Sequence, residues 1–464
     1  VYRASFAVPD MLNYLLAGGA LTVSLLPRMA TLYAKVDERH AAQAAAADAN
    51  RPALAPGADA EVGAVFSTVA STMLFAVTLG VIAAEIWTEP LVRLIVDGFD
   101  EAKVAETARL TRIVLPAQIF FIFGGLVQAN LLARQRFGAL ALTPLLYNGA
   151  IIIGGLVGAF YNAIEGFSWG ALIGAFFGAL VLPLVVARDQ LRFRPRLPSF
   201  DTEVRAFLWT AAPLMIGVSL TSVDEWCGIY FGSGLEEGSI SWLNSARRLM
   251  LVPIGLVGTA AGQATGAWIA RLYAEGRRDE LGQLLGRSVG AVAAMGLVVG
   301  GFAMAESVPI VGLLFEHGRF GRDDTLRTAA ALVPMAAGIA AWSAQAVLTR
   351  AMYGVGDTLR PMLATTVVTA LSLPLYALLA QRGIEGLALA GALGMTAQVC
   401  VLAWLCSWRL GLDLGKLAGA LGRAVPVAVA AAAVAWGIDG FTTASLSGTM
   451  AVGTGSYLLR LLAA

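Results

Sequence analysis

Apolar segments of about 20 residues or more limit what this chain can fold into more than any other feature. A helix of that length spans the hydrocarbon core of a bilayer. Of the 464 residues, 58% are hydrophobic and only 14% are charged, whereas soluble domains carry about 25% charged residues. The sequence therefore predicts an all-α polytopic membrane protein. The predicted spans are about 5–34, 64–87, 107–134, 139–161, 166–187, 205–232, 239–272, 286–314, 325–353, 359–381, 384–408, 418–438 and 443–462.

One long segment of the chain occurs twice. Residues 331–361 read ALVPMAAGIAAWSAQAVLTRAMYGVGDTLRP, and residues 115–144 read LPAQIFFIFGGLVQANLLARQRFGALALTP. The aligned pairs are Pro116 with Pro334, Arg134 with Arg350 and Pro144 with Pro361. Solenoid repeats have periods of about 20–50 residues, so a repeat of this much longer period indicates a duplicated membrane transporter instead.

The repeat also predicts the architecture. Span 205–232 precedes 239–272 in the second half, whereas nothing precedes 5–34, the first-half counterpart of 239–272. We therefore expect the parent fold to have one further helix upstream of Val1. Completed in this way, the fold has two six-helix lobes, arranged as parallel repeats around a central cavity, plus two additional C-terminal helices. The cavity is the expected substrate route.

The predicted division of the chain follows from these boundaries. The N-terminal lobe takes residues 1–200 and contains a polar, Ala- and Pro-rich insertion at about 37–61. The C-terminal lobe takes residues 201–410. The two additional transmembrane helices take residues 411–464.

Loop charges predict the orientation in the membrane. Cytoplasmic loops of membrane proteins carry an excess of Lys and Arg. Every second loop of this chain is rich in these residues, and the loops between them are poor in them. The basic loops, which we expect in the cytoplasm, lie near 28–51, 134–136, 188–205, 271–287, 350–360 and 409–423.

Several classes of function find no support in the sequence. The net charge of +1 gives no argument for binding nucleic acid, and no zinc spacing or catalytic set is present. His40 and His317 are too few for a metal site. We interpret the three cysteines as small core residues, because all lie in apolar segments without a CxxC spacing. They are Cys227, Cys400 and Cys406. We expect a transporter without a cofactor and not an enzyme.

Charged residues inside predicted spans are costly and are candidates for function. Asp224 and Glu225 lie in span 205–232, and Arg247 and Arg248 lie in its antiparallel neighbour. Adjacent residues on a helix diverge by about 100°, so one member of each pair is expected to face the cavity. The acids could tune the affinity for a substrate, promote its release or bind a coupling cation. The alternative is a structural ion pair between two helices.

A second group of polar residues opens the first half. Arg3, Asp10 and Asn13 are spaced near multiples of a helical turn and can share a face. The repeat places them at the level of Arg247 and Arg248 on the opposite lobe. Arginine forks match phosphate geometry, so these residues suit an anionic headgroup. For Arg3, the alternative is a side chain that reaches out to the interface.

The chain resembles the lipid II flippase family (MurJ, also called MviN) of the multidrug/oligosaccharidyl-lipid/polysaccharide exporter superfamily. The resemblance covers nearly the whole chain and is carried by five segments. They are PDMLNYLLAGGALTVSLLPRMATLY at 9–33, LLARQRFGALALTP at 131–144, GSISWLNSARRLMLVPIGLVGTAAG at 238–262, LLFEHGRFGRDDT at 313–325 and LTRAMYGVGDTLRP at 348–361.

This resemblance implies fourteen helices and a substrate. The chain would carry an undecaprenyl-pyrophosphate-linked saccharide across the cytoplasmic membrane by alternating access. Lipid II is the lipid-linked saccharide that the resemblance favours. Its expected partners are that lipid-linked saccharide, membrane lipid and a coupling cation. The family's paired arginines are Asn13 and Tyr14 here, a following acidic residue is Gly18, and its Asp-Arg pair is Arg247-Arg248.

Three other interpretations remain open from the sequence. The cargo could be another polyprenyl-linked polysaccharide unit. The chain could be a transport-inactive scaffold for cell-wall synthesis, which the loss of the paired arginines would favour. It could also export small amphipathic cations, but the arginines Arg247 and Arg248 count against that function.

Overall fold

The chain forms two compact units, Val1–Ser222 and Val223–Ala464, each described by itself below. The computed structural model describes residues 1–16, 25, 28–38, 58–134, 136, 138–161, 163–189, 191, 193–209 and 223–446. Within these residues every regular element is a helix, as the apolar segments predict. Residues 39–57 of the predicted insertion and residues 447–462 of the last predicted span lie outside the described residues.

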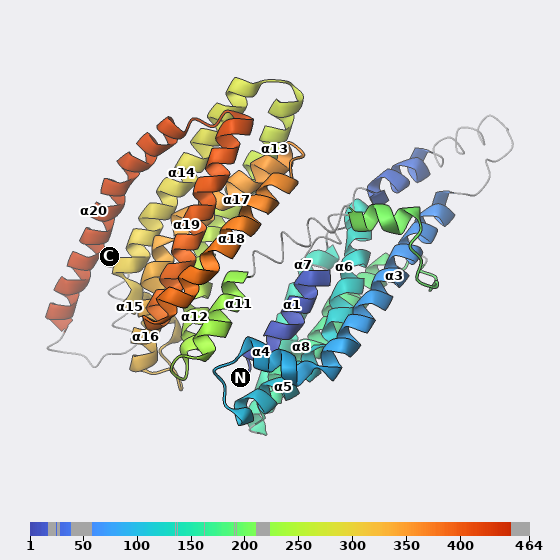
Figure 1. Ribbon diagram of the computed structural model, residues 1–464, viewed down its shortest axis with the longest axis horizontal. Coiled ribbons are helices and arrows are strands. Elements are labelled where there is room, and N and C mark those ends of the chain that lie inside the picture. The colour runs from blue at the N-terminus through green and yellow to red at the C-terminus, as the bar shows by residue number, and fades with distance from the viewer. Residues whose placement is uncertain are drawn as a thin grey trace. The chain divides into compact units, whose positions relative to one another are not determined.

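Unit 1 is a bundle of helices (Figure 1). The span predicted at 5–34 is represented by α1 and by a helix at 28–38, with most of the residues between them outside the described part. The linker at 193–201 has no regular secondary structure, and residues 202–209 are helical. The other elements are η1 (Ala4–Phe6), α1 (Ala7–Leu16), α3 (Ala58–Ile86), α4 (Thr88–Ile95), α5 (Glu101–Val114), α6 (Ala117–Ala133), α7 (Gly138–Phe160), α8 (Glu165–Gly174), η2 (Ala175–Val181) and α9 (Leu182–Ala187).

Unit 2 repeats much of this order of elements. In both units a long helix is followed by a short one, α3 by α4 and α14 by α15. Its elements are α11 (Val223–Ser233), α12 (Ser239–Pro253), η3 (Ile254–Thr259), α13 (Ala260–Ala274), α14 (Arg278–Ala305), α15 (Ser307–Phe315), α16 (Arg322–Ala337), α17 (Ile339–Gly354), α18 (Leu359–Ala380), α19 (Gly383–Leu410) and α20 (Leu414–Leu446).

Several predicted spans are interrupted in the structure. The span predicted at 107–134 is divided between α5 and α6 at Pro116, and the one at 325–353 bends by 45° between α16 and α17. The span at 286–314 breaks at Glu306, and a π-helical turn follows Pro253. Proline lacks the N–H that a continuous helix needs, which accounts for the interruptions at Pro116 and after Pro253.

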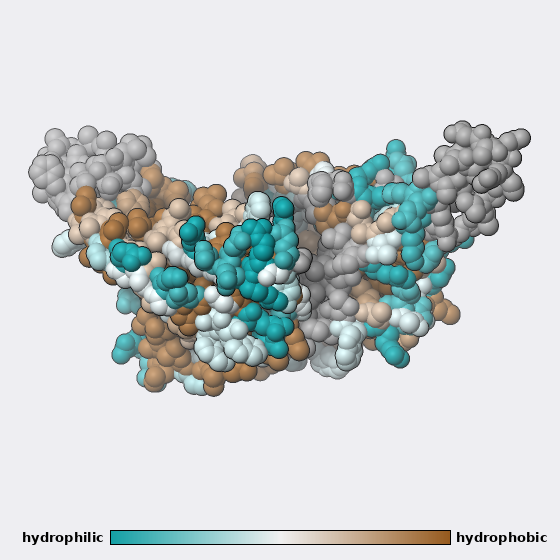
Figure 2. All heavy atoms as spheres, turned by 90° about the horizontal axis from the view of Figure 1, so that it is seen from above, coloured by the Kyte–Doolittle hydropathy of each residue, from teal (hydrophilic) through white to brown (hydrophobic). Residues whose placement is uncertain are grey.

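The membrane character of the fold is visible on its surface. Nine helices of the described part are long and apolar enough to cross a membrane, and ten if the bent pair α16–α17 counts as one span. Large apolar side chains such as Ile152, Leu156 and Trp436 are exposed, and Figure 2 shows apolar areas beside hydrophilic ones on the face that it presents. An apolar surface of this extent is expected to face lipid.

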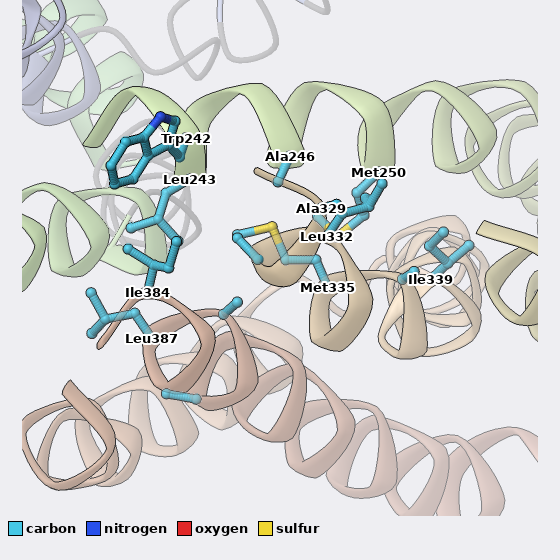
Figure 3. Packing of buried hydrophobic residues seen from close by; sticks show 14 of the residues in the cluster. Trp242, Leu243, Ala246, Met250, Ala329, Leu332, Met335, Ile339, Ile384 and Leu387 are labelled. Carbon is cyan, nitrogen blue, oxygen red and sulfur yellow. The ribbon is translucent and has the colours of Figure 1, made fainter. Parts of the chain in front are cut away.

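Unit 2 has an apolar core that fixes the position of α12. Trp242, Leu243, Ala246 and Met250 of α12 pack against residues of α16 and α19, as Figure 3 shows. A hydrogen bond of 2.8 Å from Trp242 Nε1 to Asp324 Oδ1 ties the start of α12 to α16. Arg247 follows the buried Ala246 in α12, so this packing fixes the direction in which the Arg247 side chain points.

Candidate substrate-binding residues

Asp224 and Arg247 form an ion pair within unit 2. Arg247 Nη1 donates to Asp224 Oδ2, and Nη2 lies 3.5 Å from the backbone oxygen of Asp224. The two side chains are only 17% and 20% exposed. The pair joins α11 to α12, so the structure brings together one acid and one arginine of the two pairs that the sequence singled out.

A close approach of α19 completes the surroundings of Asp224. A Cβ atom built on Gly391 would lie 2.7 Å from Asp224 Oδ1 and 3.2 Å from the Tyr376 hydroxyl. Any larger residue at position 391 would therefore force the Asp224 carboxylate to move. Neither Gly391 nor Tyr376 could be predicted from the sequence, because neither residue has a local signal for such a contact.

A small cavity borders the ion pair. Its volume is about 20 Å³, which suits about one water molecule. A water there would satisfy part of the hydrogen-bonding capacity of the two charged groups. The cavity is lined by Asp224, Arg247, Met250, Met335, Trp342, Leu387, Ala388, Gly391 and Ala392.

Arg248 and Glu225 occupy different positions from their neighbours in sequence. The Arg248 side chain is exposed, whereas Arg247 is largely buried against Asp224. Glu225 is half-buried. This difference follows from the helical rotation of about 100° between adjacent residues.

The polar residues of unit 1 lie at its first helices. Arg3 is half-buried in the turn before η1, and Asp10 is half-buried in the first turn of α1. Asn13 Nδ2 donates a hydrogen bond of 2.7 Å to Oε1 of Gln118, a buried residue of α6. Asn13 therefore links α1 to α6 in this structure.

Arg134 has a structural environment. Its guanidinium lies over the Tyr33 ring, 4.0 Å from the centroid, and Nη1 bonds to Asp37 Oδ1 at 2.8 Å. The Tyr33 hydroxyl in turn donates to Asn130 Oδ1 at 2.6 Å. Together these contacts tie residues 28–38 to the end of α6, at an end of the unit that the loop charges predict to be cytoplasmic.

A series of hydroxyl contacts along α3 was not predicted from the sequence. The backbone N–H groups of Arg194 and Arg196 donate to the hydroxyls of Ser67 and Ser71, both at 3.0 Å. Ser67 and Ser71 lie one helical turn apart, so they form one row facing the linker at 193–201. The hydroxyl pairs at four-residue spacing in an otherwise apolar helix were the available signal.

Within the described residues, no group of three His, Cys, Asp or Glu side chains could hold a metal ion. All three cysteines are free thiols, and Cys227 and Cys406 are buried.

Comparisons of the sequence with known proteins identify one family. The family model described as "Lipid II flippase MurJ" matches residues 1–454. A probable lipid II flippase MurJ of Bdellovibrio bacteriovorus is 28% identical over 418 residues, covering 87% of this chain and 75% of the relative. One from Rhizobium tropici is 27% identical, covering 83% and 70%.

Solved structures share the fold. A lipid II flippase MurJ in an inward closed conformation matches with a TM-score of 0.77 and 18% identity, over 99% of this chain and 88% of the other. An inward-facing multidrug resistance transporter of the MATE family matches with a TM-score of 0.69 and 16% identity, over 88% and 90%.

Proposed function

The chain belongs to the lipid II flippase MurJ family, and we propose that it moves lipid II across the cytoplasmic membrane by alternating access. It is a multi-pass protein of the bacterial inner membrane. The family is one of transporters, and we propose that this chain likewise carries out no catalysis. The partners in this proposal are lipid II, membrane lipid and a coupling cation.

The ion pair between Arg247 and Asp224 is the observation that supports a phosphate-binding role best. An arginine in an apolar helix bundle is costly unless a partner neutralises it. Here one carboxylate does so, with a single side-chain hydrogen bond from Nη1. A pyrophosphate offers the same guanidinium several charged oxygens in bidentate geometry.

We therefore propose that Asp224 holds Arg247 while the substrate is absent and is exchanged for the pyrophosphate when the substrate binds. The exchange keeps the arginine paired throughout, so it avoids the cost of a buried unpaired charge. A coupling cation, or a proton on Asp224, would favour the same exchange because it would remove the attraction between the two side chains. Glu225 is a second acid in this role.

The remaining candidates contribute to the same proposal with less support. Arg248 is exposed and would add a second cation next to Arg247 in sequence. In unit 1, Arg3 would contact an anionic headgroup, and the negative charge of Asp10 would weaken that contact and help to release the headgroup. Asn13 is uncharged, and its side-chain amide donates a hydrogen bond to Gln118, so we expect it to contribute least to binding an anion. In this proposal most of the positive charge that binds the pyrophosphate therefore comes from Arg247 and Arg248.

Complementation tests the function. A bacterium depleted of its own lipid II flippase would receive the gene that encodes this chain, and membrane expression would be checked. We expect growth to be restored. Failure to grow despite normal membrane expression would contradict lipid II as the cargo.

A charge reversal separates substrate binding from a structural ion pair. The double variant Asp224→Arg/Arg247→Asp retains an ion pair between α11 and α12, so a purely structural pair would still support growth. We expect the double variant to reach the membrane at a normal level and yet fail to complement. Full complementation by the double variant would contradict the proposed exchange.

A further inference from the structure

A second, much larger cavity lies at one end of unit 2, between α14, α19 and α20. Its volume is about 980 Å³. The helix ends around it belong to the loops near 271–287 and 409–423, which the charge distribution predicts to be cytoplasmic. This cavity is distinct from the small one beside the Asp224–Arg247 pair, because the two cavities share no lining residue.

Four cationic side chains line this cavity. Arg278 and Arg287 come from α14, Arg409 from the end of α19 and Lys416 from the start of α20. All four residues are exposed. They outnumber the two carboxylates of the lining, which leaves the cavity with an excess of positive charge.

The acids around the cavity are already engaged or peripheral. Asp413 lies 3.2 Å from Lys416 Nζ. The pKa of Asp413 is below its usual range, because its carboxylate accepts hydrogen bonds from the backbone and side chain of Lys416. Asp357 lies 3.9 Å from Arg409 Nε but bonds to Arg360 at 2.7 Å. Asp279, at the start of α14, is the other acid of the lining.

The floor of the cavity is made of small and apolar residues. Glycines at 282, 286 and 290 line it at four-residue spacing along α14. A Cβ atom on Gly282 would lie 2.4 Å from the backbone oxygen of Gly411, so the backbones approach closely there. Leu417, Ala420 and Ala291 extend the floor with apolar surface. The cavity therefore combines cations with an apolar wall.

The neighbouring surface has the character of a membrane interface. Trp404 and Trp408 of α19 are 60% and 66% exposed, and tryptophan is enriched where the bilayer meets water. The Arg360 guanidinium lies over the Trp408 ring, 5.3 Å from its centroid. A ligand in this cavity would have its charged part at headgroup level and apolar groups beside α14 and α20.

We propose that this cavity binds the phosphate headgroup of an anionic phospholipid from the cytoplasmic leaflet. Basic groups at that level attract anionic lipids, and a cavity between spanning helices admits the headgroup together with part of its acyl chains. This site is independent of the proposed transport of lipid II, since it uses none of the residues assigned to that function.

Native mass spectrometry of the detergent-solubilised protein tests the proposal. Phosphatidylglycerol and phosphatidylcholine would be titrated separately. We expect phosphatidylglycerol to bind more tightly, and the variant Arg287→Gln/Lys416→Gln to weaken that binding about tenfold, because each cation near an anionic headgroup contributes appreciably to affinity. Arg271→Gln/Arg277→Gln is the matched control, with the same charge change in a basic loop outside the cavity lining.

The proposal would be overturned by equal binding of the two lipids, or by equal losses in the variant and its control. Inorganic phosphate is added in a further arm: displacement of phosphatidylglycerol by phosphate alone would indicate a simple anion site and would also overturn a lipid site. Should the double variant fail to fold, the single variant Arg287→Gln must still reduce binding of phosphatidylglycerol without changing the thermal midpoint.

Discussion

Arg247 is a guanidinium inside an apolar bundle whose side-chain partner is the carboxylate of Asp224. The sequence identified both residues by the cost of placing charge in a membrane span. It could not identify which acid meets which arginine, because that depends on the rotation of α11 against α12. Nor could it find Gly391, whose role is set by the distance between two helices far apart in sequence.

The space at Gly391 gives a prediction at the residue scale. In Gly391→Ala the new methyl group would lie 2.7 Å from Asp224 Oδ1, so the carboxylate must move. We expect a loss of about 1–3 kcal/mol of stability, the usual cost of overpacking. The measurement is the thermal midpoint in detergent. Gly394→Ala is the control, because its Cβ would lie at ordinary contact distance, 3.4 Å from Ser372 Cβ. Equal midpoints would contradict this packing.

Arg134 and Arg247 are predicted to differ in effect. Arg134 stacks on Tyr33 and pairs with Asp37, which joins elements without involving the proposed substrate. We expect Arg134→Ala to reduce complementation slightly and Arg247→Ala to abolish it, at matched membrane levels. Similar, mild effects of both substitutions on growth of the flippase-depleted strain would argue against Arg247 as a substrate ligand.

The contact between α7 and α8 belongs to the scale of elements. A Cβ on Gly154 would lie 2.3 Å from the Gly166 oxygen, and one on Gly170 would lie 2.5 Å from the Ala150 oxygen. Backbones approach this closely in membranes only where small residues face each other. The sequence predicted both helices, whereas the residues that make their contact became evident only in the structure.

Two glycines of α7 therefore make a matched pair. Gly154→Ala forces two backbones apart, and we expect it to destabilise the protein by about 1–3 kcal/mol. Gly149 has open space around it, so Gly149→Ala should be neutral or stabilising, since alanine favours a helix by about 0.5–1 kcal/mol over glycine. The measurement is the thermal midpoint of unfolding of both variants in the same detergent. A midpoint for Gly154→Ala at or above that of Gly149→Ala would refute close packing of α7 on α8.

The hydroxyl row of α3 gives a second prediction at this scale. Ser67 and Ser71 accept the backbone N–H groups of Arg194 and Arg196. Ser67→Ala/Ser71→Ala should release the linker at 193–201 and raise its rate of cleavage by trypsin. Thr366→Ala is a control, since its hydroxyl bonds within its own helix to the Met362 oxygen at 2.8 Å. Unchanged cleavage of the linker in the double variant would show that these bonds do not hold it.

At the scale of the whole molecule, the repeat was the most informative feature of the sequence. It predicted that long helices recur in the same order, and the structure has that recurrence in α3–α4 and α14–α15. It did not predict the break at Glu306 or the bend between α16 and α17, because an apolar segment has the same composition whether its helix is straight or bent. The division at 1–200, 201–410 and 411–464 stays a prediction.

The insertion at about 37–61 is expected to be dispensable for transport. Insertions in surface loops change the free energy of folding little, because loop-closure entropy grows slowly with length. Deleting residues 41–58 should leave complementation nearly intact. The measurement is growth of the flippase-depleted strain together with membrane expression of the deleted protein. Loss of growth at normal expression would assign the insertion a function.

Transport of fluorescently labelled lipid II in proteoliposomes tests the central claim most directly. Purified protein would be reconstituted, and labelled lipid reaching the opposite leaflet would be measured by a quencher that cannot cross the membrane. We predict transport by the unmodified protein and by Arg271→Ala, whose side chain is exposed and pairs with Glu275, and none by Arg247→Ala. Absence of transport by the unmodified protein, or equal transport by Arg247→Ala, would contradict the account.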